Sequence, residues 1–252
     1  MNKQEATFRH LLRLGDNALI NGHRLSEWCS RGPILEEDLA LTNIALDNIG
    51  RAEAFLKYAG EVEGKGHSED YLAYRRGERA YYNNLITELP RGNFAFTIAK
   101  QLFIAAFESL FFAALSHSKD ETIAGIAAKT LKEVHYHLAH ARDWCFRLGK
   151  GTELSREKLQ TAVDELWEYT GELFEMDEAD HILIAEGIAV DLEHLRGSWL
   201  EQVAAILNAA DIIIPDTDYM QTGSRQGVHT EHLGHILTEM QYLQRAYPDA
   251  TW

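Results

Sequence analysis

Apolar residues recur every three to four positions along most of the chain, which is the period of an α-helix. The first amphipathic segment spans about 5–29, and the second opens at Pro33, carries acids in its first turns and runs to about residue 59. Two long segments follow at about 94–117 and 120–148. The former, FAFTIAKQLFIAAFESLFFAAL, is apolar nearly all round, which predicts a helix at the centre of a helical core.

Shorter helical segments are predicted in the rest of the chain. The glycine- and charge-rich stretch 60–76 predicts a long connection that contains one helical turn, and Pro90 ends a short helix at about 77–88. Three later helices are predicted with these bounds and caps: 156–175 capped by Ser155, 192–209 capped by Asp191, and Thr230 to Tyr247. The stretch DIIIPD at 211–216 could be extended, but no other strand is evident to pair with it.

These segments predict an all-α protein. We expect one helical domain over 1–252, in which a four-helix core bundle occupies about 5–148 and accessory helices occupy about 155–247. The balance of 46% hydrophobic and 25% charged residues is ordinary for a globular chain and argues against disorder.

The net charge narrows the partners that the chain can bind. Acidic residues outnumber Lys and Arg by 39 to 24, which gives a formal net charge of −15. Such a surface repels phosphate backbones and anionic membranes, so we expect neither nucleic-acid binding nor membrane binding. Because no signal peptide or membrane span is evident in the sequence, a cytoplasmic protein is expected, with Cys29 and Cys145 as buried reduced thiols.

The stretch KEVHYHLAHAR at 132–142 combines a glutamate with three histidines. Helical di-iron bundles take an acid from each of two helices and a Glu-x-x-His pair from each of the other two. Residues three apart share a helix face, so both side chains of the pair reach one metal. Here Tyr136 stands three residues after Glu133, and the histidines are offset from the pattern.

The acids of the di-iron pattern occur at suitable positions, but its histidines do not. Asp16 and Asp47 lie 31 residues apart on the first two predicted helices. That separation suits antiparallel neighbours, for which roughly 25–35 residues are expected. Gly50 stands where the second helix would carry its histidine. We interpret Asp16, Asp47, Gly50, Glu133 and Tyr136 as degenerate di-iron positions, and we predict no metal ligand and no catalytic residue in this chain.

Buried carboxylates must be paired or protonated. Arg, Lys or Tyr side chains are therefore expected to fill the space that a metal would take, with Tyr136 as one candidate. The simplest interpretation of the histidines on this helix is hydrogen bonding along a half-exposed face. Metal binding by Glu133 and His137, which lie four apart on one face, is the alternative.

A second histidine cluster lies in GVHTEHLGHILTEMQYLQR at 227–245. His232 and His235 share a helix face, and His229 precedes them, which alone is a weak metal signal. A capped amphipathic helix that packs on the fold or on a partner chain explains the same residues. No Gly-x-Gly-x-x-Gly or Gly-x-Ser-x-Gly motif occurs, so the residues themselves give no sign of catalysis.

Five blocks of the sequence together resemble one known family. They read RLGDNALINGHRLSEWC, EEDLALTNIALDNIGRA, NFAFTIAKQLFIAAF, KEVHYHLAHARDW and GVHTEHLGHILTEMQYLQR. In this order and over essentially the whole chain, they are similar to the structural C subunits of bacterial phenylacetyl-CoA epoxidases. The resemblance implies a ferritin-like fold.

The resemblance also implies a division of labour. A related catalytic subunit would carry the di-iron centre and bind phenylacetyl-CoA, while this chain has lost its metal ligands and supports that subunit in a heterodimer. A small assembly subunit and a reductase containing FAD and an iron–sulfur centre, supplied by NADPH, would complete the monooxygenase of phenylacetate catabolism. Alone, the chain could form a homodimer. Two alternatives stay open: a di-iron oxygenase or oxidase that uses Glu133 and His137, and a free-standing helical binding protein.

Overall fold

The computed structural model describes residues 1–248 and 250, and within them the fold is all-α, without a strand. The chain forms two compact units, which are described separately. Unit 1 comprises residues 1–90, 177–183 and the chain from 223 onward, and unit 2 comprises residues 91–176 and 184–222. This division cuts across the boundary expected between a core bundle and accessory helices. The expectation of a single domain stays a prediction.

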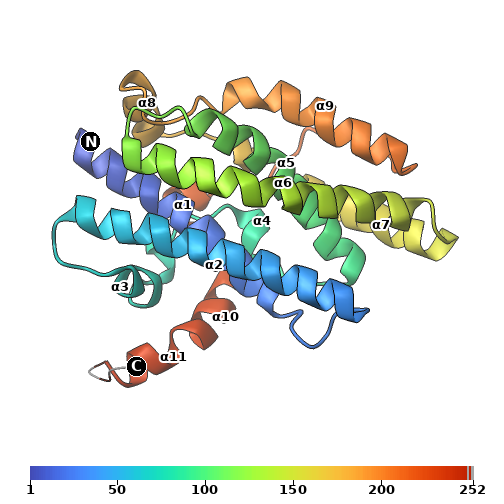
Figure 1. Ribbon diagram of the computed structural model, residues 1–252, viewed down its shortest axis with the longest axis horizontal. Coiled ribbons are helices and arrows are strands. Elements are labelled where there is room, and N and C mark those ends of the chain that lie inside the picture. The colour runs from blue at the N-terminus through green and yellow to red at the C-terminus, as the bar shows by residue number, and fades with distance from the viewer. Residues whose placement is uncertain (249, 251–252) are drawn as a thin grey trace. The chain divides into compact units, whose positions relative to one another are not determined.

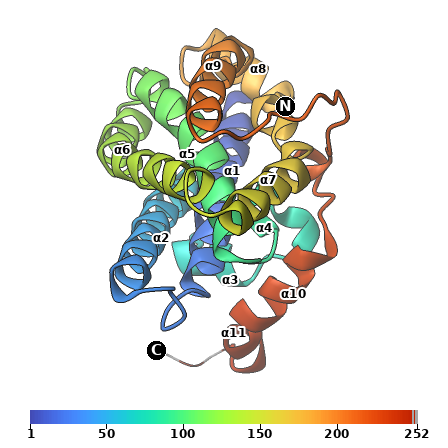
Figure 2. The same cartoon turned by 90° about the vertical axis from the view of Figure 1, so that its right-hand side faces the viewer.

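Unit 1 is built on an antiparallel pair of long helices, α1 and α2, which lie side by side in Figures 1 and 2. Its helices, in chain order, are α1 (Lys3–Ser26), α2 (Leu35–Glu63), α3 (Glu69–Tyr74), the 3₁₀ helix η1 (Glu78–Ala80), α4 (Leu85–Glu88), most of α8 (Glu178–Ala185), the 3₁₀ helix η3 (Ser224–Gln226), α10 (Glu231–Met240) and α11 (Tyr242–Ala246).

Two glycines bring α1 and α2 close together. A Cβ atom at Gly15 would lie 2.7 Å from the Leu56 side chain, and one at Gly22 would lie 2.9 Å from Cδ1 of Ile49. Since neither position has room for a side chain, the α1–α2 contact is specified by these residues.

Unit 2 is built around the apolar helix α5 (Phe94–Leu115), which packs against α6 (Glu121–Gly149), α7 (Glu153–Trp167) and α9 (Glu193–Ala209). The 3₁₀ helix η2 (Gly171–Phe174) and the end of α8 also belong to this unit. Among the described residues α5 is the one helix long and apolar enough to cross a membrane, and 78% of its most apolar window is buried. Its composition therefore matches its place as the core helix of unit 2.

Side-chain caps set where the long helices begin. Asn93 accepts a hydrogen bond from the Phe96 amide at 3.0 Å, and Asp120 accepts from the Ile123 amide at 3.0 Å. Each cap satisfies an amide that has no partner within the first helical turn. The predictions for α5 and α6 are confirmed to within a few residues.

Several predicted boundaries were wrong. Thr152, not Ser155, caps α7, because its hydroxyl accepts from the Ser155 amide at 3.1 Å. Leu192 occupies the cap position of α9, one residue after the predicted Asp191, but the Asp191 side chain does accept from the Glu193 amide at 3.1 Å. Five segments also differ from expectation: α2 continues to Glu63, residues 77–88 form η1 and α4, the helix predicted over 156–175 ends at Trp167, the terminal helix breaks at Gln241, and α8 was not predicted. Residues 211–216 form no helix or strand.

Candidate functional site

Asp16 lies on α1 and is fully buried in unit 1. The guanidinium of Arg76 donates to both of its carboxylate oxygens, through Nη1 at 3.0 Å and through a shorter contact from Nη2. The Tyr82 amide donates to the same carboxylate at 3.0 Å. A planar guanidinium matches a carboxylate with two parallel hydrogen bonds. The charge of Asp16 is therefore balanced by a cation that belongs to the chain.

Arg76 is itself held in place by its neighbours. Its Nη1 donates to the Ala80 carbonyl at 2.7 Å, its Nε donates to the Leu72 carbonyl, and its guanidinium lies 4.2 Å from the centre of the Tyr81 ring. Burial opposes the charge, but the charge of Asp16 and its hydrogen bonds raise the pKa of Arg76 above its ordinary value. Arg76 supplies the kind of partner that the sequence predicts for a buried acid.

Side chains near the C-terminal helices hydrogen-bond to the backbone carbonyl of Arg76. Nε2 of Gln241 donates to the Arg76 carbonyl at 3.0 Å, and Nη2 of Arg245 donates to the same oxygen at 3.1 Å. Gln241 is 1% exposed and also donates to the Tyr81 hydroxyl at 2.9 Å. A groove of about 540 Å³ lies on the solvent side of these residues, between η1 and the α10–α11 pair.

The α2 positions of the di-iron pattern differ from Asp16. Asp47 and Gly50 are both half-buried. A Cβ atom at Gly50 would meet no other atom within 4 Å, so the place predicted for a histidine is open space. Glycine has no side chain that could bind a metal at this position.

On α6 the pattern is also incomplete. Glu133 is 25% exposed, and Nζ of Lys129 lies 3.8 Å from its Oε1. Tyr136 is 50% exposed, so the expectation that it fills a buried space was wrong. The cause is helix phase: with about 100° per residue, Tyr136 projects to solvent while His137 turns inward.

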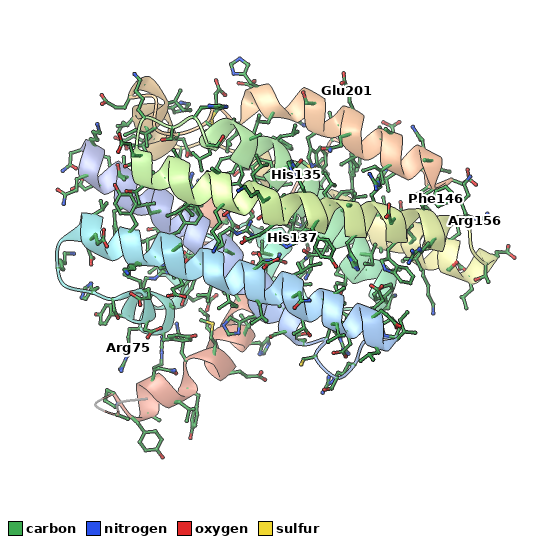
Figure 3. All side chains as sticks on the ribbon, viewed as in Figure 1. Arg75, His135, His137, Phe146, Arg156 and Glu201 are labelled. Carbon is green, nitrogen blue, oxygen red and sulfur yellow. The ribbon has the colours of Figure 1, made fainter. Side chains whose placement is uncertain are left out.

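The histidines of α6 lie in three different environments. His135 is exposed, His137 is 3% exposed, and His140 is half-buried. Figure 3 shows His135 and His137 leaving α6 on different sides. The prediction of one half-exposed face therefore holds for His140 but not for His137.

The residues present do not fit a di-iron centre. Asp16 is paired with Arg76, Gly50 has no side chain, and Tyr136 points to solvent. Among residues 1–248 and 250, no three His, Cys, Asp or Glu side chains are grouped so that they could hold a metal ion. That none of these positions binds a metal or takes part in catalysis stays a prediction.

The second histidine cluster includes a segment, residues 229–232, that hydrogen-bonds to other parts of unit 1. His229 lies with Nε2 3.0 Å from the Tyr81 carbonyl and Nδ1 3.4 Å from a Glu88 carboxylate oxygen. The Thr230 amide donates to the other Glu88 oxygen at 3.0 Å. Arg24 donates to the His232 carbonyl at 3.1 Å, and His235 is exposed. These contacts explain the segment without a metal.

A buried ionic cluster that the sequence analysis missed ties α8 to α1. Arg13 donates through Nη1 to both oxygens of Asp180, at 2.6 and 2.7 Å, and through Nη2 to Asp177 at 2.9 Å. Burial favours the neutral acid, but His10 and Arg13 hold the pKa of Asp180 far below its usual range. Burial lowers the pKa of His10. No local signal reveals this cluster, because Arg13 and Asp180 are 167 residues apart in the sequence.

The two cysteines also lie in different environments. Cys145 is buried, and burial raises its pKa to about 12. Cys29 is exposed in the turn after α1, so the expectation that both thiols are buried was wrong for it.

Comparison with known proteins identifies the family. The chain matches the phenylacetic acid catabolic protein family model over residues 1–252. It is 50% identical over 243 residues to the C subunit of the 1,2-phenylacetyl-CoA epoxidase of Escherichia coli (strain K12), a match that covers 96% of this chain and 98% of that protein. The all-helical structure agrees with the ferritin-like fold expected from the sequence. The chain belongs to the phenylacetic acid catabolic protein family.

Proposed function

We propose that the chain is the non-catalytic structural subunit of a phenylacetyl-CoA 1,2-epoxidase in the cytoplasm. Its similarity to an epoxidase C subunit over nearly its whole length supports membership of such an enzyme. The observation that carries the non-catalytic role is the Asp16–Arg76 pair. A carboxylate that accepts two hydrogen bonds from a guanidinium has its negative charge already balanced, which lowers its affinity for a metal cation.

The chemistry then belongs to a partner. We propose that a related catalytic subunit holds the di-iron centre and the thioester substrate, and that this chain supports its fold in a heterodimer. A reductase that carries FAD and an iron–sulfur centre would deliver electrons from NADPH, and a small subunit would assist assembly. The strongly acidic composition of this chain accords with an anionic coenzyme A thioester bound elsewhere.

Metal content tests the proposal. The chain is purified alone and, separately, co-expressed with the catalytic subunit, and iron is measured by plasma mass spectrometry. We expect no bound iron on the isolated chain and about two irons per heterodimer. Omitting the chain from the reconstituted enzyme should abolish or strongly reduce epoxidation.

Two variants make the test specific. Glu133→Ala combined with His137→Ala removes the alternative ligand pair, and it should leave the iron content of the heterodimer unchanged. Stoichiometric iron on the isolated chain that disappears in this variant would show that the chain is itself a di-iron protein. A chain that stays alone on co-expression would instead be a free-standing binding protein.

A further inference from the structure

The carboxylate of Glu88, on α4, is buried against the C-terminal segment, residues 228–246, which carries α10 and α11 (red in Figures 1 and 2). The Thr230 amide donates to its Oε1 at 3.0 Å, and Nδ1 of His229 lies 3.4 Å from its Oε2. Both side chains of this His229–Glu88 pair are 0% exposed, and both residues belong to unit 1. Since a buried carboxylate needs a compensating charge or a proton, the C-terminal segment supplies what Glu88 requires.

The hydrogen bonding of the His229 ring places a proton in this pair. The Tyr81 carbonyl, 3.0 Å from Nε2, can only accept, so Nε2 carries a hydrogen. A neutral imidazole would then turn the lone pair of Nδ1 toward an ionised carboxylate, which would set two buried acceptors face to face. One proton between Nδ1 and Oε2 removes that conflict. The closed segment therefore holds one proton at the pair, whichever of the two atoms carries it.

Opening of the segment changes the proton balance, because it exposes His229 and Glu88 to water. In water a histidine loses its proton near pH 6.5, and a glutamate is ionised from about pH 5 upward. Above about pH 6.5 the closed form consequently binds one proton more than the open form. The stabilisation that this proton gives is complete below about pH 6.5 and is lost as the pH rises.

The segment is built so that it can open without the rest of unit 1. The residues Leu233, Ile236 and Leu237 are its buried apolar anchors on α10, and α11 buries no side chain. Elements with few buried apolar contacts open at a lower free energy than the core. Gly223 and Gly227 stand just before the segment with φ of 139° and 69°, a region that glycine adopts at no steric cost, so the backbone can turn there.

The same segment also holds Arg76, the partner of Asp16. Gln241 and Arg245 both donate to the Arg76 carbonyl, at 3.0 and 3.1 Å. Opening removes both hydrogen bonds. The proton at the His229–Glu88 pair is thereby linked to the buried ion pair of α1.

Other charged or titratable side chains lie on the elements around the pair. They are Arg24 on α1, Glu78 and Arg79 on η1, Tyr81 before α4, and Glu231 and His232 on α10. Arg24 is held by Glu27 at 2.6 Å, and burial raises the pKa of Tyr81 above its ordinary value. Of these side-chain types, histidine is the one that ordinarily changes charge between pH 6 and pH 8. His232 is therefore the group that a test has to separate from His229.

We propose that residues 228–246 form a strap on unit 1 that is closed by the proton of the His229–Glu88 pair, opens as the pH rises from 6 to 8, and loosens Arg76 when it opens. This device lies in the chain alone and does not depend on the proposed function.

Hydrogen exchange of the isolated full-length chain tests the strap, with rates corrected for intrinsic exchange at each pH. We expect the α10 amides to exchange through an opening that is more populated than the unfolding of α2 at every pH. Loss of one proton with an ordinary histidine pKa raises that opening by up to about 25-fold between pH 6 and pH 8. The Tyr82 amide, which donates to Asp16, should follow the same pH dependence.

Glu88→Gln is the specific variant. Its amide group can accept from Thr230 and donate to a neutral Nδ1 of His229, so the segment closes without taking up a proton. The pH dependence of α10 exchange should disappear while the segment stays docked. His229→Gln carries no titrating group and should also lose the pH dependence, whatever its level of opening.

His232→Gln and His235→Gln are the matched controls on α10, and both should keep the pH dependence of the wild-type chain. A flat profile in the wild-type chain, or a pH dependence that persists in Glu88→Gln and His229→Gln, would overturn the proposal. Loss of the pH dependence in His232→Gln would assign the proton to that residue instead. Exchange of α10 and α2 at one opening free energy would mean that no separate strap exists, and a Tyr82 amide that stays protected would refute the link to Asp16.

Discussion

The interiors of the two units are stabilised by different chemistry. Unit 1 contains buried ion pairs at Asp16–Arg76 and Arg13–Asp180, together with the close approach of Glu88 and His229. Unit 2 is built on an aromatic cluster, in which the rings of Phe103, Trp167, Phe174 and Trp199 lie 5.4–5.9 Å from their neighbours.

The difference shows what each interior requires of its sequence. Aromatic packing tolerates some change of shape, because its energy is spread over many contacts. A buried ion pair tolerates the loss of neither partner, because the remaining charge stays buried without compensation. Unit 1 therefore depends on a few specific pairs, whereas unit 2 depends on filled volume.

The largest expected effect comes from emptying the aromatic cluster. Trp199→Ala should lower the free energy of unfolding of unit 2 by about 3–5 kcal/mol, since Trp199 is 1% exposed and a cavity would remain. Chemical denaturation followed by fluorescence measures the loss. As control, Trp199→Phe keeps a ring but leaves the Phe103 carbonyl without its 3.1 Å indole donor, and it should cost less. Equal losses in both variants would contradict a volume-based interior.

Breaking one ion pair should cost nearly as much in unit 1. Asp16→Asn keeps the side-chain shape but leaves Arg76 charged, and it should lower stability by about 3 kcal/mol. The double variant Asp16→Leu with Arg76→Met removes both charges and should be less destabilised than Asp16→Asn. A double-mutant cycle by urea unfolding checks this; additive losses would show that the two residues do not interact.

Acid should weaken unit 1 before unit 2. The pKa of Asp180 is held below its unfolded value of about 3.9. Its contribution is therefore complete above that value and is lost as pH falls below it. Hydrogen exchange, corrected for intrinsic rates, should show protection of α1 and α8 falling up to about eightfold more than that of α5 between pH 5 and pH 3. Asp180→Asn should remove this difference, and its persistence in the variant would assign the effect to another group.

The smallest expected effect is an increase in stability rather than a loss. Gly50→Ala should raise the stability of the isolated chain by about 0.5–1 kcal/mol, because a methyl group there meets no atom and alanine favours the helix. Gly15→Ala is the control and should be destabilising, since its Cβ would lie 2.7 Å from Leu56. Thermal unfolding measures both; a loss at Gly50 would mean that the chain itself needs glycine there.

The sequence predicted long helices better than it predicted their connections. The long apolar period located α5 and α6 to within a few residues, because this signal acts within one helix. At α7 two residues of capping type stand three apart, Thr152 and Ser155, and the periodicity alone did not choose between them. The helix α8 was missed because its 8 residues make only about two turns, which is too short a stretch for the helical spacing of apolar residues to be recognised.

The candidate site was predictable only in part. Spacing identified Asp16 and the missing donor at Gly50, both of which follow from helix geometry. Arg76 was not identified, because it lies 60 residues from Asp16 in a stretch interpreted as a connection. Tyr136 was assigned to the wrong environment, since one residue of helix phase separates it from the buried His137.

The cation beside Asp16 is covalently part of the polypeptide, and this bears on how the protein is made. A helical bundle whose buried acids are neutralised by bound iron depends on metal supply during synthesis and is destabilised by chelators. Asp16 pairs with Arg76 when unit 1 folds, and this pairing does not require iron. Unit 1 should consequently fold to the same extent under iron starvation.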